Sequence, residues 1–215
     1  MSDSTPMQMD LGGRTLFRLS EIFYTVQGEG YNQGKDALFI RFSGCNLWDG
    51  KDNSRETNRT CGAWCDTNFK LNLTFSLEEL LDVCKSTADT PTLVVITGGE
   101  PALQLTQGLV DNLYRIYPRT LICIETNGTR PINVTKCFVT VAPKENTKLL
   151  QTSGNELKVI VPQNLDFKYL DSLSFAHKWF QPKNGLENCN HALDLIQQYP
   201  AFRLSLQLHK LIGIR

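Results

Sequence analysis

Three cysteines in one polar stretch are the residues whose type and spacing most clearly suggest chemistry. Fifteen residues separate Cys45 from Cys61, and three separate Cys61 from Cys65. A zinc site built on three thiolates would need a fourth ligand, usually histidine or cysteine, and this stretch contains no histidine. Four-iron clusters are normally held by four cysteines, so three thiolates would leave one iron open to a cofactor. Structural zinc and unreactive cysteines remain the alternatives.

Glycines and polar side chains gather where apolar runs end. Gly44 follows the run before Cys45, while Gly98–Pro101 and Thr126–Gly128 follow two later runs. Nearly continuous apolar runs are typical of parallel strands covered on both faces, and ligands bind at the carboxyl ends of such strands. The runs expected to form strands are Ala37–Phe42, Leu93–Thr97, Leu121–Glu125, Cys137–Ala142, Leu157–Val161, Lys178–Phe180 and Arg203–Gln207.

Fewer helices than strands are expected around this sheet. A capping box from Ser76 to Glu79 predicts a helix that ends at about Ala88. Apolar residues at helical spacing predict two more helices, over 103–117 and 192–199. The polar stretch 46–60 is expected to be a long loop, of a length that is often functional. The sequence therefore predicts an α/β sheet with an incomplete helical coat.

Composition and charge narrow the function. The chain has 215 residues, 41% apolar and 20% charged, which predicts one globular domain over 1–215 with a flexible leader at 1–13. The 22 basic residues balance 22 acidic ones, so a small molecule is expected as partner, and neither nucleic acid nor a membrane. Seven cysteines without a secretion signal favour metal or catalytic roles and a cytoplasmic location.

Six motifs extend this interpretation over most of the chain. They are Thr25–Gly30, Phe42–Trp48, Cys61–Thr67, Thr97–Pro101, Glu125–Thr129 and Arg203–Ile214. From about Leu19 to Arg215 the chain resembles the 7-carboxy-7-deazaguanine synthase family of radical S-adenosylmethionine enzymes. Two positions depart from the family pattern: three residues separate Cys61 from Cys65 where the family has two, and Ala142 stands where the family usually has serine.

The resemblance implies an incomplete, open (β/α) barrel with about six or seven strands and few full helices. It implies a lyase of queuosine and 7-deazaguanine biosynthesis that converts 6-carboxy-5,6,7,8-tetrahydropterin to 7-carboxy-7-deazaguanine with loss of ammonia. The implied cofactors are a [4Fe–4S] cluster, S-adenosylmethionine and Mg²⁺. The cluster and S-adenosylmethionine together generate a radical that takes a hydrogen from C6 of the substrate. The implied partners are the pterin, a reducing electron donor such as flavodoxin, and a second copy of the chain in a homodimer.

The resemblance also implies roles for individual residues. The metal ligands are Cys45, Cys61 and Cys65 for the cluster and Thr67 for Mg²⁺. The residues expected at S-adenosylmethionine are Gly99, Glu100, Ala142, Pro143 and Lys144. Those expected at the substrate are Val26, Gln27, Gly28, Arg41, Thr97, Gln181, Pro182, Lys183, Asn184, His209 and Arg215. Four cysteines are expected to be buried fillers: Cys84, Cys123, Cys137 and Cys189.

Arg41 is also informative without the resemblance. It lies in an apolar run, where an unpaired charge would be costly. Its planar guanidinium matches a carboxylate, which the substrate has; the alternative is a buried salt bridge to an acid of the protein. Simpler structural roles also remain for the Gly98–Pro101 turn, Thr67, Lys144 and His209.

Two other functions compete with this interpretation. An activase of glycyl-radical enzymes would share the cluster and the Gly98–Glu100 motif, but it would lack the Gln27–Gly30 and Arg203–Ile214 motifs. A zinc-stabilised binding module would use the cysteines without catalysis.

Overall fold

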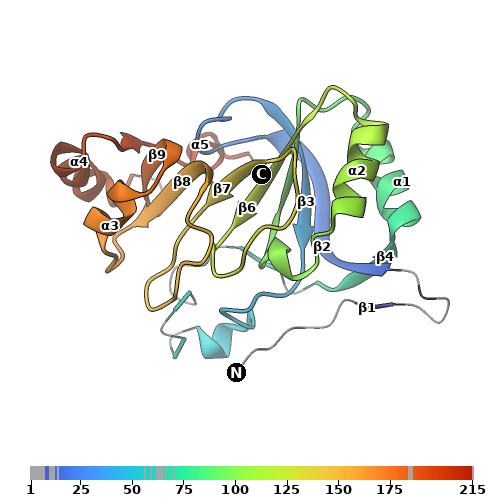
Figure 1. Ribbon diagram of the computed structural model, residues 1–215, viewed down its shortest axis with the longest axis horizontal. Helices are drawn as coiled ribbons and strands as arrows, with labels where there is room; N and C mark the ends of the chain where they lie inside the picture. Colours follow the sequence, from blue (N-terminus) through green and yellow to red (C-terminus); the bar gives the residue numbers. More distant parts are fainter. Residues whose placement is uncertain are drawn as a thin grey trace.

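One twisted sheet dominates the molecule (Figure 1). The computed structural model describes residues 8–9, 13, 15–55, 57–58, 60–61, 65, 67–69, 71–183 and 186–214. Among these residues ten strands form one sheet in the order β1-β2-β3-β5-β6-β7-β8-β9-β10, with β4 paired to β2 off this path. From β3 to β10 every neighbouring pair is parallel, whereas β2 is antiparallel to each of its neighbours.

The strands are mostly short. Their bounds are β1 Gln8–Met9, β2 Thr15–Val26, β3 Asp36–Phe42, β4 Leu73–Ser76, β5 Leu93–Gly98, β6 Leu121–Thr126, β7 Phe138–Val141, β8 Gly154–Val161, β9 Phe175–Pro182 and β10 Arg203–Leu204. The helices are α1 Leu77–Thr87, α2 Gln107–Ile116, α3 Phe167–Ser172, α4 Cys189–Gln198 and α5 Leu208–Ile212, with 3₁₀ turns at Asp52–Ser54 and Pro101–Leu103.

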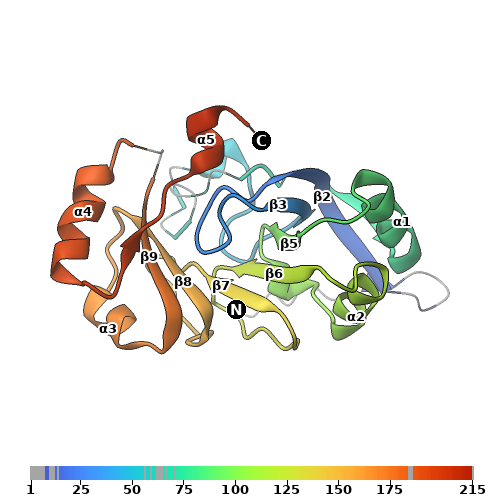
Figure 2. The same ribbon diagram turned by 90° about the horizontal axis from the view of Figure 1, so that it is seen from above.

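Helices cover the outer face of the sheet in two separate groups. Seen from above, the strands follow an open arc, with α1 and α2 outside one end, α3 and α4 outside the other, and α5 on the open side (Figure 2). Leu80 of α1 and Leu109 of α2 join Ile40 in one buried cluster. Leu170 of α3 and Leu195 of α4 belong to a second cluster. The apolar faces of both groups hold the curved sheet in place by burial.

Strand alternation divides the side chains of each strand between the outer and the inner face of the sheet. In β3, Leu38, Ile40 and Phe42 enter the outer core, whereas Ala37 and Phe39 lie in a separate inner cluster. Successive side chains of a strand point to opposite faces, so Arg41 shares the inner face with Phe39. The same period explains why polar side chains near the carboxyl ends of several strands converge.

The expected fold class is confirmed, with more strands than the six or seven expected. The additional strands include β2 and β4, and part of the expected leader, Gln8–Met9, pairs with β2. The capping box opens α1 as predicted. The helix expected over 103–117 is instead a 3₁₀ turn followed by α2, because the Thr106 side chain caps a new start by accepting from the Leu109 amide. No helix in the described part of the chain is long and apolar enough to cross a membrane.

Candidate active site

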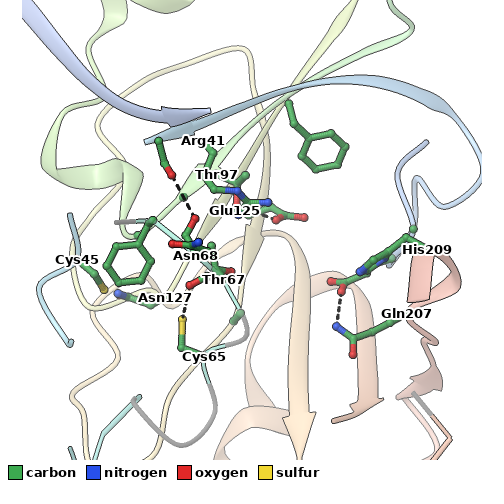
Figure 3. Close-up of a pocket in the computed structure, with 18 of the residues that line it drawn as sticks. Arg41, Cys45, Cys65, Thr67, Asn68, Thr97, Glu125, Asn127, Gln207 and His209 are labelled. Carbon is green, nitrogen blue, oxygen red and sulfur yellow. Dashed lines mark hydrogen bonds between the residues drawn. The ribbon is translucent and has the colours of Figure 1, made fainter. Parts of the chain in front are cut away.

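A cavity of about 620 Å³ opens at the carboxyl ends of the parallel strands, inside the arc of the sheet. Segments far apart in the sequence line it, from Ser20 on β2 to Lys210 on α5. Figure 3 shows Arg41, Thr97 and Glu125 at one part of the cavity, with Cys45 and Cys65 on one side and His209 on the other. The sequence predicted ligand binding at the carboxyl ends of the strands, and the structure has a cavity there.

A polar layer crosses three neighbouring strands at this level. Arg41 of β3 is in register with Thr97 of β5, and Ile96 of β5 is in register with Ile124 of β6, so Thr97 and Glu125 lie side by side. The Thr97 hydroxyl donates to Oε2 of Glu125 at 3.0 Å. Nε2 of Gln27 donates to the other carboxylate oxygen at 3.2 Å. These two bonds fix the direction in which the Glu125 carboxylate faces.

Arg41 has a protein partner on the neighbouring strand. Its Nε donates to Oε1 of Glu21 on β2 at 2.7 Å, and both side chains are largely buried. The salt bridge that the sequence left as an alternative is thus present. Since Arg41 also lines the cavity and a guanidinium carries five donors, the pair with Glu21 can orient the fork toward a ligand.

A buried lysine forms a second charged group beside the layer. Lys158 of β8 forms ion pairs with Glu29 and, at 3.5 Å, with Oε1 of Glu125. Burial alone would raise the pKa of Glu29, but the charge and hydrogen bond of Lys158 lower it to about 2. Burial alone would lower the pKa of Lys158, but Glu125 and Glu29 raise it above its ordinary value. Each charge therefore makes the other tolerable away from water.

The three cysteines expected as cluster ligands all line the cavity, and none forms a disulfide. The Cys65 amide donates to the Cys61 carbonyl at 2.8 Å. This bond holds the two cysteines close together across their three-residue spacing. Trp48 and Phe69 pack against these cysteines in a small cluster.

The donor set suits an iron–sulfur cluster. Among the described residues no group of three or more His, Cys, Asp or Glu side chains is arranged to hold a metal ion. A four-iron cluster is larger and takes each thiolate at a different iron. Burial raises the pKa of Cys45, and the hydrogen bond with Cys65 and burial raise that of Cys61. Such buried thiols lose their protons when a metal centre supplies positive charge, and the Leu47 amide already donates to the Cys45 sulfur at 3.4 Å.

The glycine pair after β5 brings this strand against the start of the cysteine loop. The Gly99 amide donates to the Phe42 carbonyl at 3.0 Å. A Cβ on Gly98 would lie 2.2 Å from the Phe42 oxygen, and one on Gly99 would lie 1.8 Å from the Gly44 oxygen. Only glycine fits such close backbone approach. The pair therefore does more than form a turn: it seats the segment that carries Cys45.

Glu100 lies behind the cavity wall. It is fully buried, and its carboxylate accepts from the Ala102 amide at 2.9 Å, the Thr126 hydroxyl at 2.7 Å and the Asn127 amide at 2.8 Å. Burial raises its pKa in spite of these bonds. In this structure Glu100 thus ties the Gly98–Pro101 turn to the end of β6.

The last helix closes the other side of the cavity. The Leu208 amide donates to the Gly28 carbonyl at 2.9 Å, and Gln207 Nε2 donates to Oε1 of Glu29 at 2.8 Å. A Cβ on Gly28 would lie 2.3 Å from Nδ1 of His209. The absence of a side chain at Gly28 therefore lets His209 reach the cavity.

Most of the predicted site residues line this one cavity. They are Val26, Gln27, Gly28, Arg41, Cys45, Cys61, Cys65, Thr67, Thr97, Gly99, Ala142, Lys144, Gln181 and His209. The described residues predicted for the site that do not line it are Glu100, Pro143, Pro182 and Lys183. Asn184 and Arg215 lie outside the described residues. Of the four expected filler cysteines, Cys84 and Cys123 are buried, but Cys137 and Cys189 are only partly so.

Several charged residues of the cavity were not predicted, among them Glu29, Glu125 and Lys158. Two of them carried the signal that identified Arg41, a charge inside an apolar run. Lys158 lies within the run Leu157–Val161, and Glu125 ends the run Leu121–Glu125. Glu29 lies in the loop after β2, where only its tertiary partner Lys158 reveals its role.

Comparisons with known proteins point in one direction. No protein-family model matches the chain. It is 38% identical over 214 residues to the 7-carboxy-7-deazaguanine synthase of Burkholderia multivorans, covering 92% of this chain and 99% of the relative. It is 39% identical over 202 residues to the enzyme of that name from Bacteroides thetaiotaomicron, covering 92% and 98%. The crystal structure of QueE from Escherichia coli matches with a TM-score of 0.70 and 27% identity, over 97% of this chain and 99% of that one.

Proposed function

Because the chain belongs to the 7-carboxy-7-deazaguanine synthase family, we propose that its cavity converts 6-carboxy-5,6,7,8-tetrahydropterin to 7-carboxy-7-deazaguanine with loss of ammonia. One observation carries the proposal. Three thiols and the polar layer of Arg41, Thr97 and Glu125 line the same cavity. A redox centre and a binding surface for a polar heterocycle therefore face each other across a space of small-molecule size.

Cys45, Cys61 and Cys65 would hold the cluster. When bound, a [4Fe–4S] cluster with one open iron supplies the electron that cleaves S-adenosylmethionine. The protein contributes position: Gly99 offers a backbone edge without a side chain, and the Lys144 ammonium is available for the ribose or carboxylate of the bound cofactor. Glu100 acts here by ordering the Asn127 amide rather than by direct contact.

The polar layer would hold the pterin. The Arg41 fork pairs with the substrate carboxylate, as guanidinium and carboxylate geometry favours. Glu125, directed by Gln27 and Thr97, accepts N–H groups from the aminopyrimidinone edge of the ring. His209 closes over the substrate from α5. The two ends of the substrate thus meet groups of opposite charge, which sets its orientation.

Thr67 is the proposed protein ligand of Mg²⁺. It lines the cavity two residues after Cys65, and Mg²⁺ typically takes few protein ligands besides substrate oxygens and water. Thr67→Ala should therefore reduce the response of the rate to added Mg²⁺ and leave cluster absorbance intact. Loss of the cluster in this variant would instead give Thr67 a structural role.

A reducing partner such as flavodoxin, a homodimeric assembly and a cytoplasmic location complete the proposal. The location follows from the chemistry, because cysteine thiols are kept reduced in the cytosol. The family relationship supports these points.

Anaerobic reconstitution tests the proposed function. The wild-type protein should take up iron and sulfide, absorb broadly near 400 nm and, with a reductant and S-adenosylmethionine, consume the carboxytetrahydropterin. Cys45→Ala, Cys61→Ala and Cys65→Ala should each abolish cluster assembly, because three thiolates leave no spare ligand. Bound zinc without colour would support the binding module. A full cluster that cleaves S-adenosylmethionine but ignores the pterin would support an activase. A full cluster in Cys61→Ala would overturn the ligand assignment.

A further inference from the structure

Lys158 is a buried cation to which no motif of the sequence points. Its side chain is 6% exposed, and its ammonium lies between the carboxylates of Glu29 and Glu125. Glu29, Lys158 and Glu125 form a charged trio. The other charged or titratable groups around it are Glu156 on the same strand and His209 and Lys210 on α5. A buried ammonium is stable only where its charge is paired, and Glu29 and Glu125 supply that pairing for Lys158.

Glu125 has two hydrogen-bond donors and one ion-pair partner in the structure. Gln27 and Thr97 donate as neutral groups, and Lys158 contributes a charge. The other carboxylate oxygen of Glu29 accepts from Gln207, the residue directly before α5. Glu29 therefore holds the ammonium in place while the ammonium faces Glu125.

We propose that Lys158 is a positioning residue, whose ammonium fixes the orientation of the Glu125 carboxylate toward the N–H groups of the substrate. The inference rests on the proposed function, since Glu125 meets the substrate there. Two carboxylates against one ammonium leave one formal negative charge on these three residues. That charge attracts the N–H edge of the ring and repels the substrate carboxylate, which is thereby directed to Arg41.

The test is a double-mutant cycle on the cluster-loaded enzyme, with the dissociation constant of 6-carboxy-5,6,7,8-tetrahydropterin as the readout. Lys158→Met removes the charge at similar length, in the wild-type background and in Glu125→Gln. Lys178→Met is the matched control. Lys178 is also a buried lysine, 11% exposed, on the neighbouring strand and paired with Asp171, but it does not line the cavity.

If Lys158 acts through Glu125, Lys158→Met weakens binding by about tenfold to 100-fold, the range for a lost hydrogen bond to a charged group. The same substitution in Glu125→Gln then changes binding by less than about threefold, because coupled residues are not additive. Lys178→Met leaves the dissociation constant unchanged, and Lys158→Arg, which keeps the charge, restores part of the loss. An equal loss in both backgrounds, or no loss in either, would overturn the proposal.

Two further arms cover a folding failure and a wrong substrate. If Lys158→Met does not fold because Glu29 is left unpaired, Lys158→Met/Glu29→Gln removes both charges together, which costs less, and carries the same cycle. If the wild-type enzyme binds no pterin, the proposed function is wrong, while amide hydrogen exchange of the cluster-loaded enzyme still tests Lys158. Exchange around Glu125 should accelerate in the Lys158 variant and not in Lys178→Met; unchanged exchange would contradict the positioning role.

Discussion

At the scale of single residues, the site follows from strand alternation. Arg41, Thr97 and Glu125 each come two positions after an inward apolar residue, namely Phe39, Val95 and Cys123. Side chains two positions apart on a strand point to the same face. The polar layer therefore lies next to the inner apolar cluster, one step closer to the carboxyl ends of the strands. Apolar packing and chemistry thus occupy successive levels of the same strands.

Arg41→Lys tests the substrate role of the guanidinium. Lysine keeps the charge but loses the planar fork, so binding of the carboxytetrahydropterin should weaken by about 1.5–3 kcal/mol. Iron content and the slow cleavage of S-adenosylmethionine without substrate should survive. Product formation and cleavage are to be measured on the same preparations. Unchanged product formation would show that the carboxylate is held elsewhere, with Lys144 and Lys183 as the next candidates.

The pair of Glu29 and Lys158 predicts a pH dependence of stability. The pKa of Glu29 falls from 4.5 to about 2 in the folded protein. Its contribution is therefore fully present above about pH 4.5 and is lost as the pH falls toward 2. In urea unfolding of the cluster-free protein, wild type should exceed Glu29→Gln by on the order of 3 kcal/mol near neutral pH. A difference that stays constant down to about pH 3 would contradict the pairing.

At the scale of elements, the ends of β3 and β5 act as one unit. The backbone of Phe42 and Gly44 approaches the Gly98–Gly99 pair so closely that no side chain fits at either glycine. The segment carrying Cys45 is thereby fixed to the strand that carries Thr97. The proposed cluster ligand Cys45 and the proposed substrate-facing group Thr97 are thus held in one frame.

Gly99→Ala should break this frame. The added methyl would meet the Gly44 carbonyl, so we expect a loss of about 2 kcal/mol or more in stability and incomplete cluster assembly. Gly108→Ala on α2 is the control, because its methyl meets nothing closer than 3.9 Å and alanine favours a helix by about 0.5–1 kcal/mol. Thermal unfolding and iron content measure both effects. Full iron content in Gly99→Ala would show that the cysteine segment does not depend on this contact.

Gly28→Ala should disturb the opposite side of the cavity. Its methyl would collide with the His209 ring and push α5 outward. We expect a higher KM for the pterin with normal iron content, because Cys45 and Cys65 lie on the other side of the cavity from His209 (Figure 3). Steady-state kinetics on the reconstituted enzyme measure this change. A KM equal to that of wild type would remove His209 from the substrate site.

The buried parallel strands and the capped helix α1 were predictable, because their apolar runs and the Ser76–Glu79 box are local signals. Strand β2 was not, since polar residues interrupt its apolar pattern. Helix α5 has only five residues and no side-chain cap, and its position depends on the distant Gly28. The burial of Glu100 was not predictable either, because its partners Thr126 and Asn127 are distant in the sequence and only the folded chain brings them close.

At the scale of the whole molecule, the open arc explains how one chain can surround its ligands. Because the sheet does not close, one side of the cavity is open to other segments (Figure 2). Helix α5 and the segment that carries the three cysteines line the cavity there. The cavity is therefore completed by segments from both halves of the sequence. The open arrangement thus brings the thiols and the polar layer to the same cavity.

The most direct test of the proposed function is product formation by one protein loaded in two ways. Anaerobic preparations carrying either the iron–sulfur cluster or zinc receive reductant, S-adenosylmethionine and 6-carboxy-5,6,7,8-tetrahydropterin. Mass spectrometry follows the deazapurine product, and ammonia is assayed in parallel. We expect 7-carboxy-7-deazaguanine and ammonia in equal amounts from the iron–sulfur form alone. A fully loaded form that cleaves S-adenosylmethionine and yields neither product would contradict the proposed function.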